Sequence, residues 1–370
     1  MATFRKRGPL QWQVQVRRKG WPLQTKTFNT QAEAKTWATM IEREMDAGAF
    51  VSRNEAESTS FSKALDTYAS EVTSKKRSSA SELSRIQAMQ RHPLALRSLA
   101  SIRGADLASY RDERLEEGLA PATVRRELAL ISHVFTIARK EWRMESLSNP
   151  AELIRQPSVD DARDRRICSA DVWALQNGKL ACEHLDELEM ICHHSRSSEL
   201  PQIVRFAVET GMRRGEISSL LRANVDLKKR TALLPMTKNG SSRGVPLSSR
   251  AAAIIENQPK LEDGRVFKSQ PDTITKAFLD ALGDARNAYE EGLELHLKSE
   301  GLKPEQAAER TARYPFLLDL RFHDLRHEAT SRLAEIFPLH ELTKITGHQD
   351  TRMLMRYYHP RTEDLAKKLG

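Results

Sequence analysis

The sequence predicts an α+β fold that is mainly α. A small N-terminal sheet with one helix comes first, then a helical region, then a mixed, mainly helical region with a small β-hairpin sheet. A length of 370 residues is too large for one typical core, which indicates two or three domains. The alternating stretch QWQVQV predicts a strand, whereas apolar residues three and four apart predict helices over most of the remainder. Polar segments divide the chain into residues 1–55, 60–155 and 165–370.

The N-terminal region is predicted to be a sheet packed on one helix. Residues 11–16 alternate apolar and polar side chains, LQTKTF (23–28) predicts a second strand, and TFRKR predicts a third. Thr30 and Glu33 have the spacing of a capping box, so a helix is expected to begin there and to end near Gly48. The open sheet face would carry Gln, Arg and Lys, which suits either a DNA groove or an ordinary solubilising surface.

Positive charge is concentrated at the N-terminus. The chain has 59 Lys and Arg against 50 Asp and Glu, a net charge of +9. Residues 1–30 contain no acidic residue, and such a segment fits a polyanion such as nucleic acid or, alternatively, a solvated basic tail. The basic residues of this segment are Arg5, Lys6, Arg7, Arg17, Arg18, Lys19 and Lys26.

Cysteine content and hydropathy indicate a cytoplasmic protein. The three cysteines form no even-numbered disulfide framework, which fits a reducing cytosol. No apolar run approaches the ~18–20 residues of a membrane span, and no apolar segment follows the charged start MATFRKRG. Neither a membrane helix nor a signal peptide is therefore predicted.

A group of cysteines and histidines raises the question of a zinc site. Its spacing matches no standard zinc-finger pattern, so no metal site is predicted and the residues are assigned to a helical insertion. The residues concerned are Cys182, His184, Cys192, His193 and His194.

The second region is predicted to be all helical. Residues 49–60 are small and polar and suggest a linker, and an amphipathic pattern begins at Phe61. Further helical segments follow over 81–142, and the unit ends near Asn149. The charged, proline-containing stretch 155–166 predicts a second linker.

The third region begins at Ile167, and its first part is predicted to be helical. Residues 225–248 then predict strands around an Asn-Gly turn at 239–240, with helices from there to the end. Two segments, 177–200 and 284–315, stand out as extra lengths of chain and are predicted to be helical insertions.

Four short stretches of the third region carry residues suited to chemistry. They are TGMRRGEI (210–217), Lys238 beside the predicted turn, HDLRH (323–327) and GHQDTRMLMRYYHP (347–360). Each is weak alone, because a lone arginine, lysine or histidine is usually a surface side chain. The order Arg, Lys, His-x-x-Arg, Gly-His, Tyr is far more specific.

This ordered set resembles the tyrosine recombinase (phage integrase) family. The resemblance is carried by residues of about 165–365 and extends more weakly to the two preceding regions. It implies an N-terminal arm-type DNA-binding domain (1–55), a helical core-binding domain (60–155) and a catalytic domain (165–370). The catalytic residues that it implies are Arg213, Lys238, His323, Arg326, His348 and Tyr357.

The family chemistry explains these residue types. A tyrosine hydroxyl attacks a DNA phosphodiester and forms a 3′-phosphotyrosine link, which conserves the bond energy, so neither ATP, metal nor another cofactor is implied. Two permanently charged guanidinium groups, Arg213 and Arg326, would hold the non-bridging oxygens. Lys238 would protonate the departing 5′ oxygen, His323 would accept the tyrosine proton or help hold the phosphate, and His348 would donate a hydrogen bond to it.

Several assignments have neighbouring rivals. Arg214 adjoins Arg213, and only one of two successive helical residues can face the phosphate, since they point about 100° apart. The family pattern favours Arg213. Glu216 either braces this arginine or forms a plain surface pair, and Arg243 is a rival to Lys238 that lies past the turn.

Two further alternatives concern the C-terminal motifs. Asp324 is either a supporting residue of the site or an acid on a helix surface. Tyr357 lies nine residues after His348, the interval of the family pattern, so Tyr358 is assigned to packing or to the phosphate surroundings.

The resemblance implies a site-specific DNA recombinase, the integrase of a phage or genomic island, acting at the bacterial nucleoid. Its implied partners are double-stranded DNA at core and arm-type sites, further copies of the chain as a dimer on one site and a tetramer in the synapse, a directionality factor and a host DNA-bending protein. Membranes are not expected among them. The alternatives are a type IB topoisomerase-like nicking-closing enzyme and a catalytically silent architectural DNA-binding protein.

Overall fold

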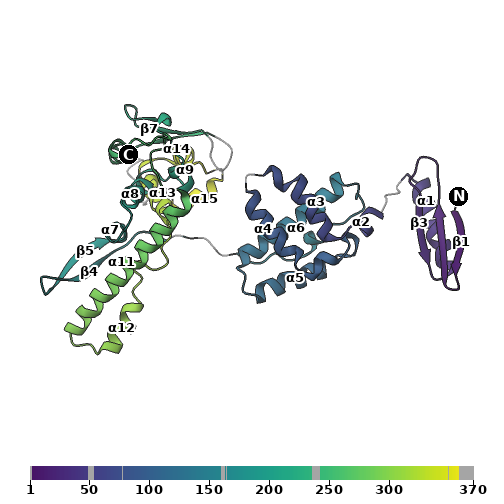
Figure 1. Cartoon of the computed structure of the whole chain (residues 1–370), viewed down its shortest axis with the longest axis horizontal. Helices are drawn as coiled ribbons and strands as arrows, with labels where there is room; N and C mark the ends of the chain where they lie inside the picture. Colours follow the sequence, from purple (N-terminus) through teal and green to yellow (C-terminus); the bar gives the residue numbers. More distant parts are fainter. Residues whose placement is uncertain are drawn as a thin grey trace, which may run out of the picture. The chain divides into compact units, whose positions relative to one another are not determined.

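The fold is described by a computed structural model that covers residues 2–48, 54–76, 78–159, 163, 165–235, 242–348 and 350–357 (Figure 1). The chain divides into two compact units, Met1–Asp161 and Ala162–Gly370. Helices dominate, and the strands form small antiparallel sheets. The predicted mainly-α α+β class is confirmed.

The N-terminal sheet has the order β1-β2-β3 and packs on one helix. Thr30 and Glu33 form the predicted capping box at the start of that helix. Val14 and Val16 of the central strand are buried against the helix, as their alternation predicted. The elements are β1 (Ala2–Gly8), β2 (Gln11–Val16), β3 (Gln24–Phe28) and α1 (Gln31–Asp46).

The rest of the first unit is helical and has a hydrophobic core separate from that of the sheet. The linker prediction for 49–60 is wrong in part, because a short helix buries Ala56 in this core. The helices are α2 (Asn54–Ser58), α3 (Phe61–Glu71), α4 (Ser79–Gln90), α5 (Gly104–Glu116) and α6 (Pro121–Glu141), joined by short 3-10 turns.

The second unit mixes helices with two small sheets. Its strands are β4 (Ser169–Gln176), β5 (Lys179–Asp186), β6 (Val225–Asp226), β7 (Thr231–Leu234) and β8 (Arg243–Pro246). Its helices are α7 (Glu187–His193), α8 (Leu200–Thr210), α9 (Arg214–Ser218), α10 (Ser249–Asn257), α11 (Pro271–Ser299), α12 (Pro304–Ala312), α13 (Asp324–Ile336), α14 (Leu339–Thr346) and α15 (Thr351–Met355).

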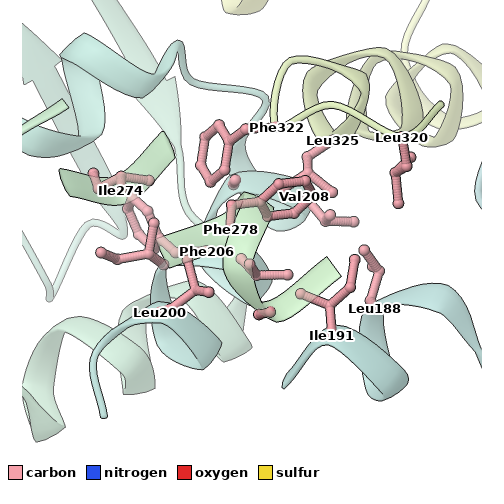
Figure 2. Close-up of a cluster of buried hydrophobic side chains, with 14 of the residues drawn as sticks. Leu188, Ile191, Leu200, Phe206, Val208, Ile274, Phe278, Leu320, Phe322 and Leu325 are labelled. Carbon is pink, nitrogen blue, oxygen red and sulfur yellow. The ribbon is translucent and has the colours of Figure 1, made fainter. Parts of the chain in front are cut away.

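The core of the second unit lies where α8, α11 and α13 meet. Figure 2 shows Phe206 and Val208 of α8 beside Phe278 of α11 and Leu325 of α13. These side chains are almost fully buried. The three helices are thereby held as a rigid support for the chain segments that end near them.

The helical predictions for 177–200 and for the stretch after Ile167 are wrong in part, because residues 169–186 form a β-hairpin, whereas α7 and α8 follow it as helices. Strands β4 and β5 pair over their full length around a turn at Asn177 and Gly178. Both turn residues have positive φ, 52° and 77°. An Asn-Gly pair favours the turn type that closes a two-residue hairpin, and that local signal outweighs the ambiguous apolar spacing around it.

The insertion predicted at 284–315 is helical, as expected. The 29-residue α11 extends beyond the core, and α12 begins at Pro304 and packs beside it (Figure 1). The β4–β5 hairpin lies along α11, with the Trp173 and His296 rings stacked at 3.8 Å and 5°.

The strands predicted in 225–248 are present as β6, β7 and β8. The predicted turn at 239–240 and Lys238 lie outside the described residues. Over the part of the chain that is described, no helix is both long and apolar enough to cross a membrane.

Candidate active site

Arg213 is positioned by the end of one helix and the start of the next. Gly211 ends α8 in the left-handed conformation, with φ of 61°, and Arg213 then caps α9. The Arg213 amide donates to Glu216 at 2.8 Å, and its guanidinium donates to the same carboxylate at 2.9 Å. Glu216 is buried, so the surface-pair alternative for this residue is wrong.

Arg326 of α13 is buried and connects two segments that are distant in sequence. Its guanidinium donates to the carbonyl oxygen of Gly211, after α8, and to that of Thr346, at the end of α14, at 2.6 Å for the second bond. Only 4% of Arg326 is exposed. The TGMR, H-x-x-R and Gly-His motifs are therefore joined through this one side chain.

Arg243 of β8 joins the same set, whereas its sequence position indicated only a rival to Lys238. Its guanidinium donates to Glu216 at 2.7 Å and to the Thr346 carbonyl at 2.7 Å. A signal for its burial was present, because Arg243 lies two residues before the buried Val245, on the same face of β8. Arg243 therefore links Glu216 to the end of α14 and holds both in place.

Gly347 allows this close approach of Arg243. Its φ is 68°, and a Cβ atom there would lie 2.5 Å from Nη1 of Arg243 and 3.1 Å from its Cδ. The glycine of the Gly-His motif is thus required both for backbone conformation and for space.

Positive charge exceeds negative charge among these residues. Glu216 bonds both Arg213 and Arg243, whereas the described bonds of Arg326 go to carbonyl oxygens. Burial, followed by repulsion from Arg213 and Arg243, lowers the pKa of Arg326 to about 9. It remains a cation at neutral pH, so a bound anion would relieve the repulsion.

His348 has a defined ring orientation. Its Nδ1 lies 2.8 Å from the Thr346 hydroxyl, which itself donates to the Leu342 carbonyl at 2.7 Å. We therefore assign the proton to Nδ1, which leaves Nε2 as an acceptor in the neutral ring. Burial, followed by Arg326 and other nearby arginines, lowers the pKa of His348 to about 4.

The Tyr357 hydroxyl meets His327, a residue to which the sequence motifs assigned no role. Oη of Tyr357 is in hydrogen-bond contact with Nδ1 of His327. The His323 and His327 rings meet edge to face, with centroids 5.1 Å apart. The sequence contained one indication of a role for His327: it lies four residues after His323, so the two side chains share one face of the helix.

Tyr357 itself follows α15 and packs against a small cluster that includes Leu342 and Leu354. Burial raises its pKa, although Arg356 and Arg326 oppose the rise. The hydroxyl is therefore protonated at neutral pH. Its neighbour Tyr358, like Lys238, lies outside the described residues.

Asp324 is fully buried, so the helix-surface alternative for it is wrong. It accepts two hydrogen bonds from Arg163, at 2.9 and 2.7 Å, and one from the Arg321 amide at 2.8 Å. Asp324 thus anchors the segment before β4 to the start of α13.

The cysteines and histidines weighed as zinc ligands do not form a cluster. Cys182 and His184 lie on β5, whereas Cys192 belongs to α7. Within the described ranges, no three His, Cys, Asp or Glu side chains are grouped so as to hold a metal ion.

Comparison with known proteins gives consistent similarities. The profile of the Phage integrase family matches residues 182–364. The shufflon-specific DNA recombinase of Escherichia coli is 37% identical over 319 residues, covering 84% of this chain and 71% of the relative. A Haemophilus influenzae protein with the provisional name integrase/recombinase is 33% identical over 364 residues, covering 97% and 87%.

A solved structure has a similar fold. The crystal structure of a lambda integrase tetramer bound to a Holliday junction gives a TM-score of 0.57 at 17% identity, covering 96% of this chain and 94% of that one.

Proposed function

The chain belongs to the phage integrase family and is a tyrosine-type site-specific DNA recombinase, and we propose how its residues divide the work of cutting and rejoining DNA. The observation that carries the proposal is the convergence of Arg213, Arg243 and Arg326 around one carboxylate, Glu216, and one carbonyl, that of Thr346. This surplus of buried positive charge suits a phosphodiester.

Arg213 and Arg326 bind the non-bridging oxygens of the scissile phosphate in this proposal. Arg243 and Glu216 hold these two arginines in position. The arriving phosphate charge raises the pKa of His348, so that its ring gains a proton on Nε2 and donates it in a hydrogen bond to the phosphate.

Tyr357 is the nucleophile. Its Oη forms a bond to phosphorus while the bond to the 5′ oxygen breaks, which leaves a 3′-phosphotyrosine link. Lys238 supplies the proton to the departing 5′ oxygen. The reverse attack by a 5′ hydroxyl rejoins the strand, and neither ATP nor a metal is needed because the bond energy is kept in the link.

The three predicted domains contribute different DNA contacts. Residues 60–155 and 165–370 bind the core site, mostly through phosphates. The open face of the N-terminal sheet binds accessory, arm-type sites: on this face Gln13 of the central strand pairs with Arg5 on one side and with Thr27 on the other, and Arg7 donates to Gln13 at 2.9 Å. A sheet with polar side chains on its open face can enter a DNA groove.

Two kinds of recombination reaction are candidates for this protein. Integration of a phage or genomic island is favoured by the basic N-terminal sheet. Rearrangement of a shufflon is favoured by the 37% identity to the E. coli recombinase of that name. In either case two copies act on each site and four in the synapse, as in the lambda integrase tetramer, at DNA in the bacterial nucleoid. A directionality factor and a host DNA-bending protein would set the direction.

The test of this proposal requires no defined target sequence at the outset. The full chain is incubated with a nicked, randomised duplex library, and protein-linked DNA is isolated under denaturing conditions and sequenced. We expect enriched sites. On the enriched duplex, Arg213→Ala should lower the rate of adduct formation ~10²–10³-fold. The matched control Arg214→Ala, at the adjacent and more exposed position, should change it little.

Other results would contradict the proposal. DNA binding without an adduct would support the silent architectural alternative. Adducts and relaxation of supercoiled DNA, without strand exchange between two enriched sites, would support the topoisomerase-like alternative.

A further inference from the structure

We infer that His327, rather than His323, takes the proton from Oη of Tyr357 during strand cleavage and returns it during rejoining. The inference rests on the proposed function, in which Tyr357 is the nucleophile. It begins from the direct contact between Nδ1 of His327 and the tyrosine hydroxyl.

The contact is built from two separate elements. His327 lies in the first turn of α13, one turn after His323, which caps that helix. Tyr357 follows α15, and its ring packs against apolar residues that include Leu342 and Leu354. The Tyr357 and His327 ring centroids are 5.5 Å apart, and the His323 ring meets the His327 ring edge to face. His327 therefore contacts both rings, with Nδ1 toward the hydroxyl.

The hydroxyl needs a base and His327 can be one. Burial raises the pKa of Tyr357, so the group is protonated near neutral pH. Burial lowers the pKa of His327, so its ring is neutral, and in the tautomer with the proton on Nε2 we assign Nδ1 as the acceptor of the Tyr357 hydroxyl proton. General bases of this kind need hydrogen-bond reach to the proton that they remove, and this pair has it.

The step balances without another reactant. The Oη–H bond of Tyr357 breaks as a proton moves to Nδ1 of His327, giving an imidazolium. The Oη–P bond forms while the bond from phosphorus to the 5′ oxygen breaks, and that oxygen receives its proton from Lys238. In rejoining, the attacking 5′ hydroxyl gives its proton back to the neutral Lys238 amine as the O5′–P bond forms, and the imidazolium returns its proton to the departing tyrosine oxygen.

Charges from several elements face His327. On its own helix, Asp324 favours the protonated ring and Arg326 disfavours it. Arg163, before β4, and Arg356, after α15, also disfavour it. His348, after α14, is close enough for its own pKa to be affected by His327. The surrounding cations therefore favour the neutral ring, which is the form that accepts a proton.

His323 is left with the other role that the family resemblance allowed. It is exposed to solvent, and the contact that the structure describes for the Tyr357 hydroxyl is to His327. Burial, followed by the nearby His327, Arg326 and Arg213, lowers the pKa of His323 to about 4, so this ring lies close to the phosphate-binding arginines. His323 is thus assigned to holding the phosphate.

The test uses the full chain and the duplex enriched by wild-type protein. Single-turnover adduct formation is measured from about pH 5 to pH 10 for wild type, His327→Ala and His323→Gln. We expect His327→Ala to slow adduct formation ~10²-fold or more. Its rate should keep rising with pH toward the tyrosine pKa, whereas the wild-type rate levels off above the histidine pKa. His323→Gln should be slower but keep the wild-type shape.

Two further measurements separate a base from a structural residue. Added imidazole should restore adduct formation by His327→Ala, since a small base can enter the space left by the ring. A duplex with sulfur replacing the bridging 5′ oxygen, a better leaving group, should restore Lys238→Ala but not His327→Ala. Circular dichroism and thermal unfolding establish that each variant is folded.

The outcomes are distinct. An unchanged or faster rate of adduct formation in His327→Ala would overturn the assignment of His327 as the base. So would a slow rate that imidazole does not restore in a folded variant. In both cases the adducts formed by the wild-type protein would leave the proposed function intact. The absence of any wild-type adduct would overturn the proposed function and, with it, this inference.

Discussion

Glu216 is the residue on which the arrangement of the arginines depends. It accepts from both Arg213 and Arg243, and it is buried, so removing its charge would leave Arg243 as an uncompensated buried cation. Breaking a buried pair from one side is much more costly than losing a pair on the surface.

We expect Glu216→Gln to lower the free energy of unfolding by about 3 kcal/mol, measured by urea denaturation. The control is Glu309→Gln, which removes an ion pair with Arg313 in which both side chains are largely exposed; its cost should stay below about 1 kcal/mol. Equal losses in the free energy of unfolding for the two substitutions would show that Glu216 does not stabilise the buried arginines.

His348 should make DNA binding depend on pH. Its pKa is about 4 in the free protein, and the arriving phosphate raises it, so the complex holds more protons than the free chain between the two values. Affinity for the enriched duplex should therefore increase as pH falls through the higher value toward about 4.

Fluorescence anisotropy at constant salt measures this dependence. His348→Gln should flatten it, and His340→Gln, a histidine 76% exposed, should leave it as in wild type. The free fold behaves in the opposite sense: because the folded pKa lies below the usual 6.5, stability is present above the unfolded value and is lost as pH falls toward about 4. An affinity that is flat with pH in wild type would contradict the proposed protonation.

Motif order identified some site residues and missed others for physical reasons. Arg213 and Arg326 stand in short recognisable motifs, and the structure joins their segments through the Gly211 carbonyl. Arg243 and His327 act through contacts 103 and 30 residues away in sequence. Such contacts follow from tertiary packing, which spacing along the chain does not encode.

At the scale of elements, the β4–β5 hairpin depends on one glycine of α11. A Cβ atom on Gly292 would lie 1.6 Å from the Trp173 carbonyl oxygen, whereas nothing lies within 4 Å of a Cβ on Gly283 in the same helix. The helix and the hairpin backbone can approach this closely only because the side chain is absent.

Gly292→Ala should lower the free energy of unfolding by roughly 1–3 kcal/mol through overpacking, despite the higher helix propensity of alanine. Gly283→Ala should raise it by up to about 1 kcal/mol. Tryptophan fluorescence should also change in the first variant, because Trp173 loses its stacking on His296. If both alanines stabilise the protein equally, the hairpin does not pack on α11 as described.

The elements also show how far local patterns reach. The strict alternation of β2 and the capping box of α1 predicted both elements directly. A helix is wrongly predicted for the β4–β5 hairpin because the apolar residues of β4 are consecutive (VWAL, 172–175) rather than alternating, so their spacing does not separate strand from helix. The Asn177–Gly178 pair was the informative signal.

At the scale of the whole molecule, the N-terminal sheet has its own hydrophobic core, separate from that of α2 to α6. We therefore predict that deleting residues 1–55 leaves adduct formation on the core duplex within a few-fold of wild type. Recombination on full-length sites with accessory sequences should be lost, as followed by product analysis. Unchanged recombination on full-length sites would show that the accessory-binding role is wrong.

The central claim for the whole chain is that strand cleavage passes through Tyr357. Protein-linked DNA is formed on the enriched duplex, digested with protease, and the DNA-bound peptide is identified by mass spectrometry for wild type, Tyr357→Phe and Tyr358→Phe. We predict a link at Tyr357, no adduct with Tyr357→Phe, and an adduct with Tyr358→Phe. An adduct that survives Tyr357→Phe and disappears with Tyr358→Phe would contradict both the nucleophile assignment and the role of His327.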